Sequence, residues 1–386
     1  MAIGEGYSRP AVAGGRLFLF DRYADRARLT CLNAATGREL WRSEYSTDYQ
    51  DYYGFSNGPR SSPVVDGGRV YTFGAEGRLR CHRVAEGRLL WDVDTAADFA
   101  VVQNFFGVAS TPVVEDQLLI VPIGGSAPGS PDVRSGRVRG SGSGIVAFDK
   151  LTGEVRYRIT DELASYSSPI VRTIGERRWG FVFARGGLVG FEPRTGKVDF
   201  EFPWRARKIE SVIAATPVVV DDTVFVTESY EPGAALLRVK PGGYDVLRKD
   251  PPGRRGTLRS HWATPVYHDG YLYGCSGSGS GDAQLVAVDY STGELAWSEP
   301  KLGRTTLLYV DGHLIVLAEY GELIVIEATP RGFRPVARVT LAEAGSSGKP
   351  RPLITHPAWS PPVLSDGLLY VRGRDQLVCL DLQRPE

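Results

Sequence analysis

The stretches SSPVVDGGRVYTF (residues 61–73) and LRCHRVAEGRLLW (residues 79–91) decide the fold of this chain. Their short runs of apolar and β-branched residues are typical of strands, and no longer window of the sequence has helical periodicity. Asp66-Gly67 suits a tight hairpin, because both positions tolerate a positive φ. Glu86-Gly87 marks a second turn. The two stretches together predict a unit of four antiparallel strands.

The same unit recurs along the chain at intervals of roughly 50 residues. Each copy begins with small, mostly polar residues, a marker residue that is usually proline, and two apolar residues. The markers are Pro10, Pro63, Pro112, Pro169, Pro217, Pro265, Leu307 and Pro362. Eight such units predict an all-β protein, an eight-bladed β-propeller with four-stranded antiparallel blades, in which residues 1–386 form a single domain.

The last unit is incomplete. It supplies three strands, at residues 362–364, 368–372 and 377–382, and the sequence stops at Glu386. Only Met1–Tyr7 precede the first blade, which is too short for a good fourth strand. We therefore expect a three-stranded or weakly closed last blade, whose edge could pair with another copy of the chain. The short start also suggests a trimmed chain.

Composition excludes several classes of protein. The chain carries 45 basic and 45 acidic residues and has no basic stripe interleaved with aromatics, so nucleic acid is not an expected partner. No apolar run approaches the roughly 20 residues of a membrane-spanning helix. The N-terminus has no signal peptide, so either the protein is cytosolic or a leader has been removed. The four cysteines lie far apart, and no metal site is expected.

Two segments carry a family resemblance: LNAATGRELW at residues 32–41 and VDYSTGELAW at residues 288–297. This pattern resembles the PQQ-like repeat, found in quinoprotein alcohol dehydrogenases and in BamB-like assembly propellers. The resemblance covers almost the whole chain, whereas the Trp-Asp endings of WD40 repeats are missing. It implies the fold and makes a periplasmic or exported origin plausible, but it says little about activity.

The repeat also suggests a role for three cysteines. Cys31, Cys81 and Cys379 occupy one third-strand position, where other units carry Ala147, Gly190 and Ala287. That position requires a small side chain because neighbouring sheets pack face to face. We expect these cysteines to be inert buried thiols.

Loops on one face of the predicted propeller are the candidate binding surface, because a rigid scaffold presents functional residues on its loops. Aromatic, basic and amide side chains gather in the loops that enter each innermost strand. The candidates are Tyr53, Asn57, Arg60, Gln103, Asn104, Phe106, Tyr166, Ile213, Trp262, Arg304 and Trp359. Either they bind a small molecule or protein on the loop face and in a central funnel, or they cap the propeller core.

Two further features of the loop face have open interpretations. Residues 213–216 and 262–264 are mostly apolar where earlier blades have polar residues, which indicates a hydrophobic sub-pocket or tighter packing. Residues 140–144 and 276–281 alternate Gly and Ser like flexible linkers. They are either natural turns or signs of an engineered variant. No helix follows either one, so neither is a dinucleotide-binding motif.

Catalytic motifs are weak. The resembled quinone dehydrogenases use a vicinal Cys-Cys pair and a calcium triad, which this sequence does not match, so no cofactor is expected. His261, His356 and Glu210 are the acid–base candidates, although each histidine could instead bond to nearby backbone. Three hypotheses follow: a non-catalytic binding scaffold, which we favour; an enzyme, natural or designed, that uses the funnel as its active site; and a relative that retains PQQ binding.

Overall fold

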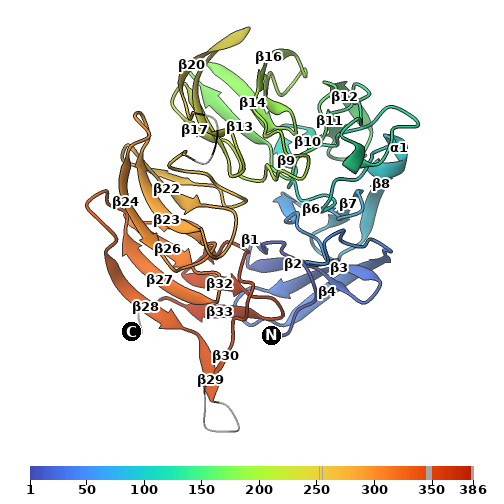
Figure 1. The fold of residues 1–386 in the computed structure, drawn as a ribbon. Helices are drawn as coiled ribbons and strands as arrows, with labels where there is room; N and C mark the ends of the chain where they lie inside the picture. The colour runs from blue at the N-terminus through green and yellow to red at the C-terminus, as the bar shows by residue number, and fades with distance from the viewer. Residues whose placement is uncertain (252, 254, 345–349, 384–386) are drawn as a thin grey trace.

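The computed structural model describes residues 1–251, 253, 255–344 and 350–383. The sheets form a ring of eight blades around a central axis (Figure 1). Seven blades are four-stranded antiparallel sheets and the last has three strands, as the sequence predicts. No helix in the described residues is long and apolar enough to cross a membrane.

The first four blades follow the order of the chain. Blade 1 holds β1 (Ala11–Ala13), β2 (Arg16–Tyr23), β3 (Arg26–Asn33) and β4 (Glu39–Ser46). Blade 2 holds β5 (Val64–Asp66), β6 (Arg69–Phe73), β7 (Arg78–Arg83) and β8 (Leu89–Asp94), and the short helix α1 (Thr95–Asp98) follows. Blade 3 holds β9 (Val113–Glu115), β10 (Leu118–Pro122), β11 (Ile145–Asp149) and β12 (Val155–Ile159), with the 3-10 turn η1 (Val133–Ser135) between its second and third strands. Blade 4 holds β13 (Ile170–Ile174), β14 (Arg177–Phe183), β15 (Gly187–Phe191) and β16 (Val198–Pro203).

The other four blades complete the ring. Blade 5 holds β17 (Val218–Val220), β18 (Thr223–Glu228), β19 (Gly233–Lys240) and β20 (Gly243–Lys249). Blade 6 holds β21 (Val266–His268), β22 (Tyr271–Ser276), β23 (Gln284–Asp289) and β24 (Leu295–Pro300). Blade 7 holds β25 (Thr306–Val310), β26 (His313–Leu317), β27 (Glu322–Glu327) and β28 (Pro335–Thr340). The hairpin of β29 (Ala342–Ala344) and β30 (Pro350–Pro352) projects from the ring before blade 8, which holds β31 (Val363–Ser365), β32 (Leu368–Arg372) and β33 (Leu377–Asp381) (Figure 1).

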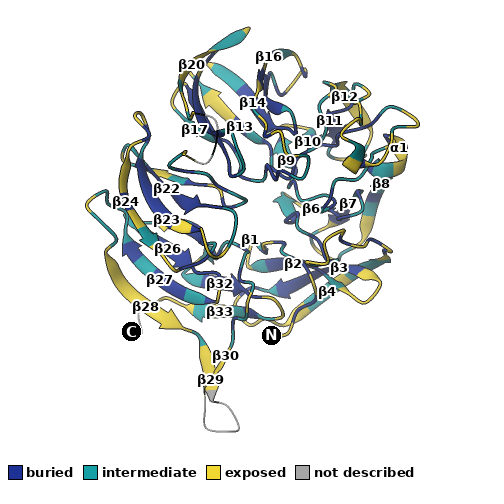
Figure 2. Cartoon of the chain, in the orientation of Figure 1, coloured by how far each residue is buried: buried dark blue, intermediate teal, exposed yellow. Residues whose placement is uncertain are grey.

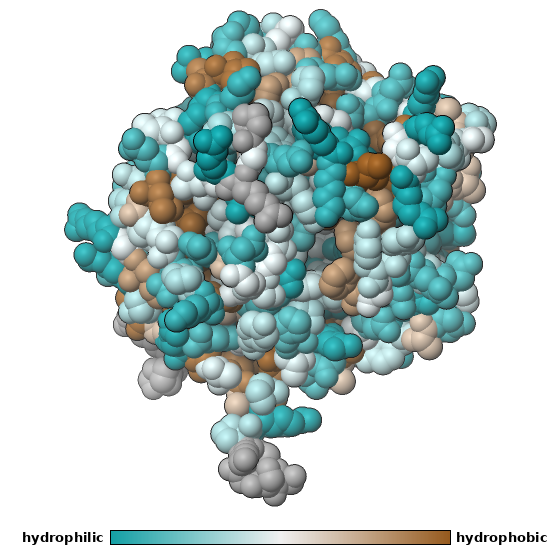
Figure 3. Space-filling model, in the orientation of Figure 1, coloured by the Kyte–Doolittle hydropathy of each residue, from teal (hydrophilic) through white to brown (hydrophobic). Residues whose placement is uncertain are grey.

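The hydrophobic core is divided among the seams between blades. Each of eight buried apolar clusters contains residues of two consecutive sheets, for example Tyr71 and Leu79 of blade 2 with Val121 and Phe148 of blade 3. Second and third strands of the four-stranded blades are therefore largely buried, whereas outermost strands such as β28 face solvent (Figure 2). The surface seen from this side is mostly hydrophilic, with small separate apolar patches (Figure 3).

Ring closure depends on contacts between the first and last blades. The isolated bridge Ala2–Gln376 sets the N-terminal residues against the start of β33. Arg372 is fully buried at this seam, and its guanidinium donates to the carbonyl oxygens of Ser8, Gly4 and Phe20. Burial lowers the pKa of Arg372 to about 10. Carbonyls that converge on one buried cation hold the two ends of the chain together.

The cysteine prediction is correct for two residues and wrong for one. Cys31 and Cys81 are buried, but Cys379 is exposed. The position is covered only where a fourth strand lies beside the third, and blade 8 has no fourth strand. Cys275 is also buried.

Candidate functional site

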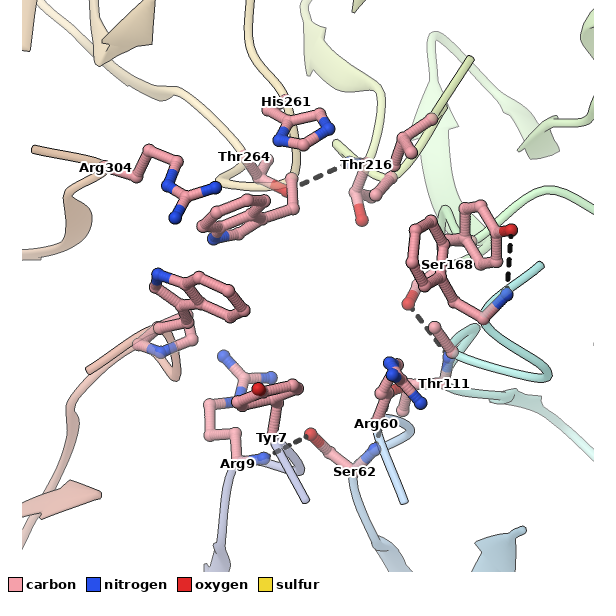
Figure 4. Close-up of a pocket in the computed structure, with 18 of the residues that line it drawn as sticks. Tyr7, Arg9, Arg60, Ser62, Thr111, Ser168, Thr216, His261, Thr264 and Arg304 are labelled. Carbon is pink, nitrogen blue, oxygen red and sulfur yellow. Dashed lines mark hydrogen bonds between the residues drawn. The ribbon is translucent and has the colours of Figure 1, made fainter. Parts of the chain in front are cut away.

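A cavity of about 320 Å³ opens at the centre of the ring, and residues from all eight blades line it (Figure 4). Its volume lies within the range of small-molecule sites. We call this cavity the funnel. Its main lining residues are Tyr7, Arg9, Phe55, Arg60, Ser62, Phe106, Thr111, Tyr166, Ser168, Val212, Thr216, His261, Trp262, Thr264, Arg304 and Trp359.

Hydrogen bonds between neighbouring blades shape one side of the funnel. In four places, the residue before a marker proline donates its backbone N–H to a hydroxyl at the same position of the next blade. Arg9 donates to Ser62 at 3.1 Å, Ser62 to Thr111 at 2.9 Å, and Thr111 to Ser168 at 3.0 Å. Thr216 donates to Thr264 in the same way at 2.9 Å (Figure 4). These bonds fix the relative positions of the inner strands and satisfy backbone groups that no sheet satisfies.

Aromatic rings cover the rest of the wall. Trp359 lies at their centre, with ring centroids 4.8 Å from Trp262, 5.0 Å from Tyr7 and 6.0 Å from Phe55. The series continues from Phe55 to Phe106 at 6.0 Å. Such distances are those of favourable offset or edge-on ring contacts. The wall therefore presents a wide apolar surface to the funnel.

Arg304 lies among these rings. Its guanidinium is 4.8 Å from the centroid of Trp262 and 4.6 Å from that of Trp359, which places it in cation–π contact with both. Its side chain and backbone N–H both donate to the fully buried carboxylate of Glu319. Trp359 Nε1 also donates to Glu319, at 3.0 Å. Burial alone would raise the pKa of Glu319, but these hydrogen bonds outweigh it and lower the pKa to about 2.

Two other arginines face the funnel. Arg60 donates to Asp51 at 2.9 Å, and its Nη1 atom is buried without a partner among the described residues. Arg9 has an exposed side chain, and no described acidic side chain forms an ion pair with it. No carboxylate belongs to the described lining of the funnel. The wall is therefore cationic as well as aromatic.

Sequence comparison places the chain within a family. A family model described as "Outer membrane protein assembly factor BamB" matches residues 25–256, which is more than half of the chain. The chain belongs to the BamB family. No curated protein sequence matches the chain.

Solved structures share the fold of this BamB-family chain. BamB from Moraxella catarrhalis aligns over 96% of this chain and 92% of its own length, with a TM-score of 0.60 and 13% sequence identity. The quinohemoprotein alcohol dehydrogenase from Comamonas testosteroni aligns over 96% of this chain and 70% of its own, with a TM-score of 0.63 and 14% identity. The computationally designed Ika8 protein aligns over 98% of each chain, with a TM-score of 0.56 and 11% identity. At these identities the likeness concerns the fold alone.

The structure brings six of the eleven ligand-binding candidates together in the funnel of this BamB-family propeller. They are Arg60, Phe106, Tyr166, Trp262, Arg304 and Trp359. Tyr53 lies outside the lining, with its ring 5.4 Å from Phe106 and its side chain exposed. Ile213 is buried in the core between blades 4 and 5.

The amide candidates support loops. Asn57 Oδ1 accepts from the backbone N–H of Asp51 at 2.8 Å. The amide groups of Gln103 and Asn104 donate to the carbonyls of Ala75 and Ala164, both at 3.3 Å. Gln103 and Asn104 border a second, much smaller cavity of about 30 Å³.

The three acid–base candidates are not joined by any hydrogen bond among the described residues. His261 lines the funnel, where its Nε2 lies 3.2 Å from Tyr230 Oη. Burial, with a contribution from Arg304, lowers the pKa of His261 to about 4, so the imidazole is neutral at pH 7. His356 lies outside the lining, with its Nε2 3.5 Å from Glu319 and its ring 4.9 Å from Tyr320. Glu210 is also outside the lining.

Sequence reasoning missed Tyr7, Arg9 and the hydroxyl residues before the marker prolines. The small polar residue at that position was itself the available signal, because a hydroxyl residue precedes the marker in blades 2 to 7. No group of three or more potential metal-ligating side chains occurs in the described part of the chain.

The Gly/Ser loops lie between second and third strands, in blades 3 and 6. A Cβ atom at Gly140 would lie 1.9 Å from the carbonyl oxygen of Asp161, so glycine has a packing reason in this loop. The question of an engineered origin stays open.

Proposed function

We propose that this chain is a non-catalytic binding module whose funnel takes a small organic anion with an aromatic or apolar body. The charge of the funnel wall carries the proposal: three arginines face the cavity, and its described lining includes no carboxylate. Asp51 and Glu319 balance Arg60 and Arg304 from outside the lining, whereas Arg9 forms no such pair. A carboxylate or phosphate would complement Arg9 in a cavity partly shielded from water.

Unpartnered hydrogen-bond donors in the wall support the same ligand class. Arg60 Nη1 and Trp262 Nε1 are buried without partners among the described residues, and both atoms can only donate. A buried donor without a partner costs roughly 1–3 kcal/mol. An anion supplies acceptor oxygens and can remove part of that cost. A cationic ligand would leave these donors unpartnered and would be repelled by Arg9.

The aromatic wall favours an apolar body on this anion. Trp262, Trp359 and Tyr7 meet at ring-centroid distances of 4.8 to 5.0 Å and present their surfaces to the funnel. A planar ligand could contact these rings while its charged group faces Arg9. The volume of about 320 Å³ suits a molecule of one to three fused rings.

We prefer binding to catalysis because the acid–base candidates do not converge. A general base must reach the proton that it removes and have a pKa near the working pH. His261 is in the funnel, but its low pKa makes it a weak base, while His356 and Glu210 lie outside the lining. The enzymatic alternative would require a reaction for which His261 is the sole acid–base group. A reaction rate that stays unchanged in both His261→Ala and His356→Ala would exclude these histidines as catalytic residues.

A protein partner is the second candidate, favoured by exposed aromatic residues outside the cavity. Tyr52 and Tyr320 are each more than half exposed, and the matching family is described as an assembly factor. Exposed aromatics of this kind are enriched at protein interfaces. Tyr52→Ser and Tyr320→Ser should weaken capture of such a partner and leave small-anion binding unchanged.

Calorimetric titration with two matched ligands tests the funnel. We expect 2-naphthoate to bind at least tenfold more tightly than the neutral 2-naphthalenemethanol. Arg9→Met should remove this preference, whereas Arg42→Met, on the exposed outer strand β4, should preserve it. Equal affinities of the two ligands for the wild-type protein would overturn the proposal. PQQ is the third ligand and is tested with and without calcium. The cofactor-binding alternative would be favoured if PQQ binds only with calcium present and neither naphthalene compound binds.

A further inference from the structure

In blades 1, 2, 3, 4 and 6 the outermost strand carries one aromatic side chain opposite the third strand. Trp41 of β4 lies against the turn at Gly87 in blade 2, where an added Cβ would be 2.4 Å from the indole. Its Nε1 donates to the carbonyl oxygen of Val84 at 2.9 Å. In blade 2, Trp91 lies in the same way on the turn at Gly153 of blade 3.

The aromatic residue has a fixed place in the sheet as well. It pairs directly with the small residue of the third strand: Trp41 with Cys31 and Trp91 with Cys81. The same pairing recurs in blades 3, 4 and 6, as Tyr157 with Ala147, Phe200 with Gly190 and Trp297 with Ala287. A small third-strand residue, an aromatic partner and a neighbouring turn thus form one repeated unit of packing.

Blade 8 has the small residue and the turn but no aromatic. Cys379 pairs with Tyr370 on its inner side, and its outer side is exposed. The neighbouring turn at Gly37 in blade 1 is equally uncovered, since an added Cβ there would meet nothing within 4 Å. Ala34 in blade 1 corresponds to Val84 in blade 2, since each lies three residues before the glycine of its turn. The carbonyl oxygen of Ala34 already accepts a hydrogen bond from Tyr370 Oη at 3.0 Å.

The open edge of β33 is also aligned for strand pairing. Leu377 exchanges hydrogen bonds with Met1, the N–H of each donating to the carbonyl of the other at 2.9 Å. Hydrogen-bonding groups alternate along a strand, so Cys379 and Asp381 direct theirs to the same edge. No described residue pairs with that edge beyond Leu377.

We propose that the edge of β33 and the turn at Gly37 form a docking site for an extended segment of a partner polypeptide. The segment runs antiparallel to β33 and places a tryptophan or tyrosine opposite Cys379, where the ring covers Gly37. Main-chain hydrogen bonds supply affinity and the aromatic ring supplies specificity. A second copy of this chain fits less well, because β33 itself (Leu377–Asp381) has no aromatic residue to offer.

A peptide from the chain itself is a suitable probe. The segment EGRLLWDV (residues 86–93) contains the turn and most of β8, the outer strand of blade 2, and carries Trp91 opposite Cys81. We expect the free peptide to bind saturably and to slow maleimide labelling of Cys379, the exposed thiol, by at least tenfold. The peptide with Trp91→Ala should bind at least tenfold more weakly. Unchanged labelling at high peptide concentration would overturn the proposal.

A variant of the protein separates this site from adventitious binding. Gly37 has φ +69°, which Asn tolerates better than other side chains. The side chain in Gly37→Asn would occupy the space that the indole of the partner segment would fill. It should weaken peptide binding at least tenfold while leaving the urea midpoint nearly unchanged. Equal affinity for this variant, or a peptide-free dimer cross-linked through Cys379, would contradict the partner assignment. Neither result affects the funnel, because the two sites share no residue.

Discussion

Replacing Glu319 by Gln should destabilise the protein in a pH-dependent way. The carboxylate is fully buried and accepts hydrogen bonds from Arg304 and Trp359, which lower its pKa from 4.5 to about 2. At 1.36 kcal/mol per pKa unit, the difference corresponds to about 3 kcal/mol of stability at pH 7. Because the folded pKa is the lower one, this contribution is complete above pH 4.5 and is lost as the pH falls towards 2.

Urea unfolding at pH 7 and pH 2.5 measures this effect. We expect Glu319→Gln to lower the free energy of unfolding by about 2–3 kcal/mol at pH 7 and by about 1 kcal/mol at pH 2.5. The matched control is Glu343→Gln, in an exposed ion pair with Arg351, which should change stability by less than about 0.5 kcal/mol. A loss at pH 7 no larger than that of the control, or a loss independent of pH, would refute the role assigned to Glu319.

Three further measurements check other parts of the molecule. Burial raises the pKa of Glu228 to about 7, so the stability of the wild-type protein should fall by at most about 3 kcal/mol as the pH rises from 5 to 8. Urea titrations of Glu228→Gln should show no such fall. The same pH dependence in the variant would contradict the raised pKa of Glu228. The pKa of His261 near 4 predicts an NMR titration midpoint far below 6 and naphthoate affinity that is constant between pH 5.5 and 8; a tenfold change in affinity near pH 6.5 would show a charged imidazole. Ser62→Ala removes the acceptor of the Arg9 N–H and should cost about 1 kcal/mol, whereas the exposed Ser298→Ala should cost less than half of that; equal losses would show that the bonds between blades contribute little.

The fold could be predicted from sequence because its signals are local and repeated. Turns such as Asp66-Gly67 and Thr36-Gly37 fix hairpins within a few residues, and the marker position recurs in eight units. The three strands of the last blade were also predictable, since the last unit contains three strand-like apolar runs. The bridge from Ala2 to Gln376 joins the two ends of the chain, and no local pattern indicates it.

The site was only partly predictable, because its geometry depends on contacts between blades. Trp262, Arg304 and Trp359 were identified as a class of loop residues, but their contact with Glu319 joins segments that are distant in sequence. Ile213 shows what composition cannot predict. It belongs to a loop that enters an innermost strand, yet its side chain packs in the core between blades 4 and 5. Cys379 illustrates another limit, since burial at a repeated position depends on the strand beside it.

Crystallography with a brominated aromatic carboxylate tests the central claim most directly. With 6-bromo-2-naphthoate, the anomalous bromine signal should lie inside the funnel near Trp262 and Trp359, with the carboxylate beside Arg9. The neutral 6-bromo-2-naphthalenemethanol should give no such signal at the same concentration. A bromine signal outside the funnel, or an equal signal from the neutral compound, would contradict the account of the funnel as an anion site.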